Sequence, residues 1–152
     1  MYSRSLVFAQ FFLIGMMVLF SRGILNSWFA LTILVAGVLF GLWTIRYNEL
    51  GNFNIRPELK EGCSLITTGP YRFVRHPMYT SVLVMSLALA VGTPSYLEWS
   101  SFILLAVILA LKSVREERLW CEGSAEYKAY MQKTKSFIPY MMSFNRGIIF
   151  SK

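Results

Sequence analysis

The chain has 152 residues, of which 55% are hydrophobic and only 15% are charged. Soluble domains usually contain about 45–50% apolar and about 25% charged residues. This composition, with a mean hydropathy of +0.49, therefore disfavours a soluble enzyme, a disordered chain and a disulfide-rich scaffold. The net charge of +7 fits either nucleic acid or an anionic membrane surface, and the positions of the basic residues decide between them.

Four apolar stretches predict an all-α integral membrane protein with about four transmembrane helices, at residues 6–20, 24–45, 77–92 and 96–111. A spanning helix needs about 20 apolar residues, with a range of about 17–25. The second stretch reaches this length, and the others need their flanks. A soluble four-helix bundle needs polar outer faces, whereas the first, third and fourth stretches are apolar all round. Gln10 is the only strongly polar residue of the first stretch.

The first stretch also resembles the apolar region of a secretion signal, because Arg4 precedes it. However, residues 20–22 (Phe-Ser-Arg) form a poor cleavage site. We therefore expect the stretch to remain as the first span, and residues 1–152 to form a single integral-membrane domain.

The basic residues indicate the topology. With four spans, fourteen of the fifteen lysines and arginines fall on one side of the membrane, and only Arg22 falls on the other. The fourteen are Arg4, Arg46, Arg56, Lys60, Arg72, Arg75, Lys112, Arg115, Arg118, Lys128, Lys133, Lys135, Arg146 and Lys152. The positive-inside rule then places both termini and the central loop in the cytoplasm. The charge is explained without nucleic acid.

The segment after the fourth stretch is expected to be a helical cytoplasmic tail. Residues 112–120 continue the fourth helix out of the membrane, and residues 127–132 form a short helix after Gly123. Residues 137–140 (Phe-Ile-Pro-Tyr) are expected to lie back on the membrane surface, where aromatic side chains are frequent.

Metal chemistry has little support in this sequence. Cys63 and Cys121 form no CxxC pair, His76 is the only histidine, and all eight acidic residues are glutamates. No spacing suits a zinc site, and Mg²⁺-dependent phosphoryl transfer relies largely on aspartate. We expect no metal cofactor.

The first polar cluster, residues 68–79, opens the third apolar stretch. Gly69-Pro70 predicts a turn, and Pro77 suits the first position of a helix, with His76 before it in extended backbone. The free amides of that helix start attract a carboxylate or phosphate, and Arg72 and Arg75 add positive charge. The alternative is a basic loop anchored among lipid headgroups by its aromatic residues.

The second polar cluster contains Glu116 and Glu117 at the exit of the fourth stretch. Adjacent helical positions point about 100° apart. One glutamate is therefore expected to face the bundle, and the other to face water or pair with Arg115 or Arg118. The alternative is a solvated helix end with weak local ion pairs.

Together the two clusters resemble the isoprenylcysteine carboxyl methyltransferase family and related integral-membrane methyltransferases, including the phospholipid methyltransferases. The matching residues lie between positions 63 and 140, about half of the chain. They are Gly69, Tyr71, Arg72, Arg75, His76, Pro77, Tyr79, Glu116, Glu117, Tyr127, Tyr130, Ile138 and Pro139.

The resemblance implies S-adenosylmethionine as cofactor, S-adenosylhomocysteine as product, and no metal. The implied cofactor contacts are Cys63, Ser64, Leu65 and Ile66 in a strand-like segment, then Tyr71, His76, Pro77, Met78, Tyr79, Glu116 and Glu117. Glu116 is expected to hold the methionine part. Lys112, at the place of the family's substrate-contacting arginine, and Arg75 are expected on the substrate side.

The chemistry of these residues suits this cofactor. A glutamate accepts hydrogen bonds from an α-amino group, and His76 with the helix start meets the carboxylate. Tyr71 and Tyr79 pack on the adenine or face the sulfonium.

The expected function is methyl transfer to a lipophilic acceptor, a lipid or a lipidated molecule, and a carboxylate of the isoprenylcysteine type is favoured. A phospholipid amine and a thiol are alternatives within the same fold. Two departures from the family pattern, Ser81 for a glycine and Lys112 for the arginine, favour a further alternative, a non-catalytic membrane protein. The small size favours a prokaryotic cytoplasmic membrane, and the endoplasmic reticulum also fits. The sequence carries no signal for an oligomeric state.

Overall fold

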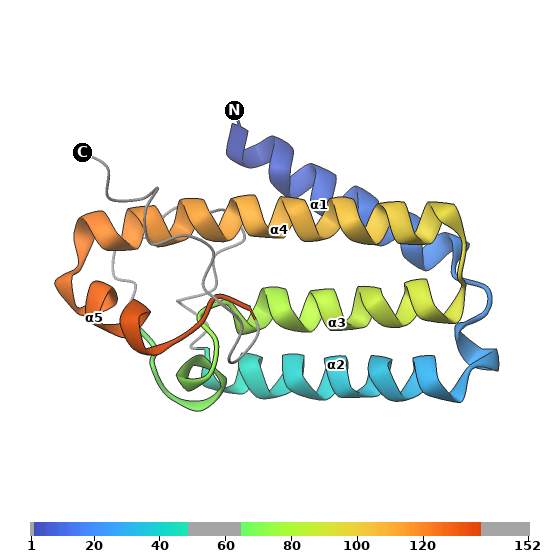
Figure 1. Cartoon of the computed structure of the whole chain (residues 1–152), viewed down its shortest axis with the longest axis horizontal. Coiled ribbons are helices and arrows are strands. Elements are labelled where there is room, and N and C mark those ends of the chain that lie inside the picture. The colour runs from blue at the N-terminus through green and yellow to red at the C-terminus, as the bar shows by residue number, and fades with distance from the viewer. Residues whose placement is uncertain (1, 49–64, 138–152) are drawn as a thin grey trace.

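The structure, a computed structural model, describes residues 2–48 and 65–137 (Figure 1). These residues form five α-helices and no β-strand within the described ranges. The helices are α1 (Tyr2–Phe20), α2 (Trp28–Tyr47), α3 (Pro77–Gly92), α4 (Tyr96–Gly123) and α5 (Ala125–Lys133). Two short 3₁₀ helices, η1 (Ile24–Asn26) and η3 (Gly69–Arg72), lie in the connections. The predicted all-α fold is confirmed.

The predicted boundaries differ mainly at the starts of α1 and α2, and α1 begins at Tyr2, four residues before its apolar stretch. α2 was expected from residue 24, but residues 24–26 form η1, and Ser27 begins the helix by accepting a hydrogen bond from the amide of Ala30 at 3.2 Å. Such a side-chain cap satisfies one of the free amides of a helix start. α3 has the predicted bounds, and α4 continues through the predicted residues 112–120 and on to Gly123. α5 contains the predicted short helix, whereas residues 138–140 lie outside the described residues.

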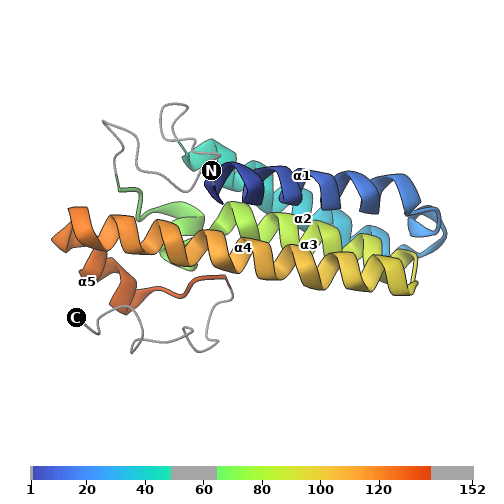
Figure 2. The same ribbon diagram turned by 90° about the horizontal axis from the view of Figure 1, so that it is seen from above.

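Helices α1 to α4 run alternately up and down, with the α1–α2 and α3–α4 turns at one end (Figures 1 and 2). α2 and α3 make the most extensive contact in the molecule. Gly37 and Gly41 of α2 permit it, because a Cβ on Gly37 would lie 2.8 Å from the Met85 side chain and one on Gly41 would lie 2.9 Å from Ser81 Oγ. Small residues four apart allow close helix packing in membranes.

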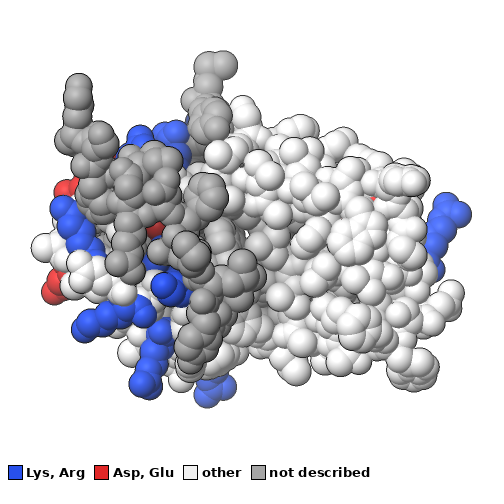
Figure 3. Space-filling model, viewed as in Figure 1, with Lys and Arg blue, Asp and Glu red and all other residues white. Residues whose placement is uncertain are grey.

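The middle of the molecule is covered by apolar side chains. On the face drawn in Figure 3, most charged side chains gather at the end where α5 lies, some basic ones lie at the opposite end, and the surface between is almost free of them. Many large hydrophobic residues are more than half exposed, among them Phe8, Leu39 and Ile103. In the most apolar 18-residue window of α2 only 22% is buried, so α2 is not the covered core helix of a soluble protein.

Two of the four long helices, α2 and α4, are long and apolar enough to cross a membrane, with window hydropathies of 2.1 and 1.8. α3 and the apolar part of α1 are shorter. The four-span arrangement therefore stays a prediction, while the apolar surface supports association with a membrane.

Candidate functional site

The site begins at a tight turn before α3. Gly69 has a φ of 58°, in the left-handed region that favours glycine. A Cβ there would lie 2.5 Å from the ring of Tyr47 at the end of α2. η3 therefore packs against α2, and the chain that follows it is directed toward α3 and the exit of α4.

A C-terminal segment, residues 134–137, lies beside the residues that precede α3, and we call it the strap. The backbone amide of Arg75 donates to the carbonyl of Lys135 at 2.7 Å, and that of His76 donates to Ser136 at 3.0 Å. These bonds form a short parallel bridge between Val74 and Lys135. The strap thus holds the start of α3 against the end of α5.

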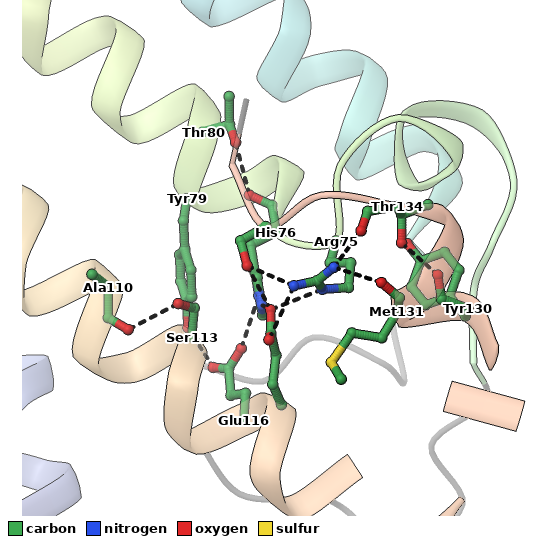
Figure 4. Close-up of polar contacts among 12 residues, drawn as sticks. Arg75, His76, Tyr79, Thr80, Ala110, Ser113, Glu116, Tyr130, Met131 and Thr134 are labelled. Carbon is green, nitrogen blue, oxygen red and sulfur yellow. Dashed lines mark hydrogen bonds and ion pairs between the residues drawn. The ribbon is translucent and has the colours of Figure 1, made fainter. Parts of the chain in front are cut away.

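Arg75 forms hydrogen bonds both to the strap and to α4 (Figure 4). Its Nε and Nη2 donate to the two carboxylate oxygens of Glu117 at 2.9 and 3.1 Å. Its Nη1 donates to the carbonyls of Met131 and Thr134, and its Nη2 also donates to Ser136 Oγ. A guanidinium has five N–H donors, and all five have protein acceptors here.

Both glutamates reach His76, one on each ring nitrogen. Glu117 Oε1 lies 2.9 Å from Nε2, and Glu116 Oε2 lies 3.4 Å from Nδ1. Glu117 is the more buried, with 6% of its side chain exposed against 19% for Glu116. The expected ion pairs with Arg115 or Arg118 are absent from the described part of the chain, where the imidazole takes their place. Glu116 and Glu117, although adjacent on the helix, thus contact the two nitrogens of the same imidazole ring.

The buried charges reinforce one another. Burial alone lowers the pKa of His76, but hydrogen bonds to Glu116 and Glu117 outweigh it and raise that pKa above its ordinary value of 6.5. Burial raises the pKa of Glu117, but its bonds to His76 and Arg75 bring it down to about 2. The geometry therefore favours an imidazolium between two carboxylates.

Tyr79, the third residue of α3, contacts both His76 and Glu116. Its hydroxyl donates to Glu116, and its ring stacks on His76 with centroids 5.6 Å apart. Phe137 of the strap lies 5.8 Å from the same imidazole. His76 is therefore held by both neighbouring rings as well as by the two glutamates.

Lys112 lies one turn before Glu116 on α4 and is 1% exposed. Its ammonium donates to Gln10 Oε1 of α1 at 2.6 Å and sits 5.0 Å from the centroid of the Tyr79 ring. Lys112 is predicted from the sequence as a site residue, whereas Gln10 is not. The available signal was the isolated glutamine in an apolar stretch.

Tyr71 and Leu65, from the segment before α3, contact α5 and the end of α4. The carbonyl of Tyr71 accepts from the hydroxyl of Tyr130. Burial, followed by the charge of Glu116, raises the pKa of Tyr71 to about 12, so its phenol is neutral. Leu65 packs against a small core that includes Cys121.

The expected strand-like segment is only partly visible. Leu65 and Ile66 have no regular secondary structure, so the strand expectation was wrong for them, while Cys63 and Ser64 lie outside the described residues. No neighbouring strand is present in the described ranges to pair with this segment.

The remaining predicted positions lie at the start of α3. Pro77 is its first residue and is buried, and Met78 follows it, half-buried. Ser81 faces Gly41 in the α2–α3 contact. The departure from the family glycine at Ser81 is thus a matter of helix packing, apart from the His76 cluster.

The donor set fits the amino-acid part of S-adenosylmethionine. Glu116 is a partly exposed carboxylate, and each of its oxygens has a second lone pair beyond the bonds to His76 and Tyr79. Pro77 has no N–H, and the amide of Thr80 donates to the carbonyl of His76 at 3.0 Å. The amides of Met78 and Tyr79 are therefore the first-turn donors of α3 that lack an acceptor within the helix, and they favour a carboxylate. Within the described residues, no three histidine, cysteine or glutamate side chains group as metal ligands.

Known proteins match the same region. The phospholipid methyltransferase family matches residues 12–122, well over half of the chain. A cobalt-zinc-cadmium resistance protein, CzcN, of Cupriavidus metallidurans is 34% identical over 86 residues, which cover 55% of this chain. The chain spans about two fifths of that relative, since the match covers 39% of its length. The family match includes both polar clusters.

Proposed function

The chain belongs to the phospholipid methyltransferase family, and from this premise we propose that it transfers a methyl group from S-adenosylmethionine to a lipophilic acceptor at a membrane surface. The observation that carries the proposal is the position of Glu116. Its carboxylate is partly exposed, lies at the start of α3, and is fixed by Tyr79 and His76. These are the residues that the motif resemblance assigns to the cofactor.

In the proposal, Glu116 accepts hydrogen bonds from the ammonium of the cofactor, and the backbone amides of Met78 and Tyr79 bind the cofactor carboxylate. Tyr71, neutral and close to Glu116, contributes an aromatic face for the adenine. When bound, S-adenosylmethionine supplies a methyl group activated by a sulfonium. The protein contributes alignment of the reacting groups and exclusion of water.

His76, Arg75 and Glu117 act as positioning residues in this scheme. The ring nitrogens of His76 already bind Glu116 and Glu117, and every N–H of Arg75 has a protein acceptor. Their role is to set the direction of the Glu116 carboxylate. This assignment replaces the expected substrate contact of Arg75 and the expected direct cofactor contacts of His76 and Glu117.

The acceptor is proposed to be a carboxylate of the isoprenylcysteine type, which follows from the resemblance to that family. A carboxylate or thiolate attacks the methyl group with its own lone pair, whereas a protonated amine must first lose a proton to a base. A phospholipid amine is the second candidate, because the matching family is described by that substrate class. A thiol is the third.

The topology is part of the proposal. We propose four spans, with α1 and α3 extended by their flanks, and the site at the cytoplasmic face. The basic residues of η3, α4 and α5 surround the site, and the positive-inside rule places such residues in the cytoplasm.

The experiment incubates purified protein in lipid nanodiscs with methyl-labelled S-adenosylmethionine and three acceptors in parallel. These are an N-acetylated, S-prenylated cysteine, phosphatidylethanolamine, and a small alkyl thiol. Label is expected in the prenylated cysteine, in a base-labile form, as a methyl ester. Label in another acceptor would reassign the substrate class, and cofactor binding without transfer to any acceptor would favour a non-catalytic protein.

A further inference from the structure

α1 lies outside the two motif clusters, yet it contributes a buried polar contact to the site. Its face toward α4 consists of Leu6, Leu13 and Met17, all buried, with Gln10 in the same stripe. A leucine at this position would continue the apolar stripe, so the glutamine is unexpected on packing grounds. Gln10 is 7% exposed.

The partner of Gln10 is a buried ammonium. Lys112 continues the buried face of α4 after Leu105 and Leu109, and Gln10 Oε1 accepts from its Nζ at 2.6 Å. A buried ammonium is costly unless it is paired and hydrogen-bonded. The pair is therefore a specific feature of the α1–α4 contact.

The ammonium is also placed against the site. Lys112 Nζ lies 5.0 Å from the centroid of the Tyr79 ring, and the Tyr79 hydroxyl donates to Glu116. A cation over an aromatic face is attracted to it, more strongly when desolvated. Lys112 and Glu116 are four residues apart, so they share one face of α4. Lys112 lies over the ring of Tyr79, and Glu116 accepts from the hydroxyl of the same residue.

We propose that Gln10 is a positioning residue for the cofactor site, acting through Lys112 and Tyr79 on Glu116. Gln10 orients the ammonium of Lys112, and this ammonium orients the ring of Tyr79. The orientation of the ring places the Tyr79 hydroxyl against the carboxylate of Glu116. This inference rests on the proposed function, because Gln10 affects cofactor affinity in this way only if Glu116 binds the cofactor.

The test measures S-adenosylmethionine affinity by calorimetry in nanodiscs for four variants. Gln10→Met removes the acceptor at nearly equal volume and is expected to weaken binding about three- to tenfold. Gln10→Glu keeps an acceptor oxygen and is expected to restore affinity to within about twofold of wild type. Leu13→Met, a change on the same face of α1, is the matched control and is expected to bind as wild type.

If the single variant Gln10→Met does not fold, the double variant Gln10→Met/Lys112→Met is measured in its place. Replacing a buried polar pair with apolar residues of similar size is often neutral for stability, but the double variant still lacks the ammonium over Tyr79. It is expected to fold and to bind the cofactor about three- to tenfold more weakly than wild type.

Wild-type affinity in a folded Gln10→Met or double variant would overturn the inference and leave the proposed function intact. Weakened binding by both variants with no rescue by Gln10→Glu would also overturn it, because a general packing defect would then explain the loss. No binding by the wild-type protein would instead remove the proposed function, and this inference with it.

Discussion

The two buried glutamates of α4, near its opposite ends, show how differently one helix accommodates a carboxylate. Glu117 is bound by Arg75, His76 and Ser136. Glu98 is 1% exposed, and neither of its carboxylate oxygens has a hydrogen-bond partner in the described part of the chain. The charged end of the molecule is thus an organised polar network, while the opposite end holds an isolated acid.

The isolated acid has a local explanation. Ser95 begins α4 by accepting from the amide of Glu98 at 3.2 Å, and a serine followed three residues later by glutamate is a common helix start. The positive end of the helix dipole favours an acid there. Glu98 therefore belongs to helix initiation, whereas Glu117 connects three segments that are distant in sequence.

The largest expected effect separates these two glutamates. Glu117→Gln leaves Arg75 without its buried counter-charge, and breaking such a pair costs about 3–5 kcal/mol. Glu98→Gln removes a carboxylate that lacks partners and is expected to change the free energy of unfolding by less than about 1 kcal/mol. Unfolding in mixed micelles, followed by circular dichroism, measures both. Equal destabilisation by the two variants would contradict the comparison.

The next effect concerns the apolar half of the molecule. Gly37→Ala places a methyl group 3.0 Å from the Met85 amide nitrogen and 2.8 Å from its side chain, so α2 and α3 must separate. The expected cost is about 1–3 kcal/mol. Gly15→Ala is the matched control, because a Cβ there meets nothing within 4 Å. The same unfolding assay measures both, and a neutral Gly37→Ala would show that close α2–α3 packing is dispensable.

The smallest effect is a pH dependence of the charged end. The pKa of His76 is raised in the folded protein, so the stability that its charge contributes is full below pH 6.5 and is lost as pH rises through the folded pKa. The pKa of Glu117 is lowered to about 2, so its contribution is full above pH 4.5 and is lost as pH falls toward 2.

His76→Gln isolates the alkaline part of this dependence. The difference in the free energy of unfolding between wild type and variant is expected to shrink as pH rises from about 6 to about 9. Unfolding curves at several pH values measure it, and a difference that stays constant over this range would show that the imidazole is neutral in the folded protein.

The helices were predictable because long apolar stretches have few alternatives in a membrane. Their ends were predictable only where a local signal exists, as at Pro77. The start of α2 was missed because Ile24 is as apolar as the helix itself, and only the Ser27 cap and the preceding 3₁₀ turn set the boundary.

The site was predictable in its residue types and not in its connections. The proximity of His76, Tyr79 and Glu116 follows from the motif order. The strap contributes mainly backbone carbonyls and amides, which every residue type carries, so no sequence pattern marks it. Gln10 forms its contact with Lys112 across 102 positions, a separation over which composition and periodicity carry no information.

The central claim is that Glu116 binds S-adenosylmethionine, and calorimetric titration of that cofactor into wild-type protein, Glu116→Gln and Glu122→Gln in nanodiscs tests it most directly. Glu122 is an exposed glutamate on the same helix and serves as the matched control. The account predicts that Glu116→Gln weakens cofactor binding about 10- to 100-fold, since the cofactor ammonium loses its negatively charged partner and one acceptor oxygen becomes an NH2 donor, while Glu122→Gln binds as wild type. Equal affinity for all three proteins would contradict it.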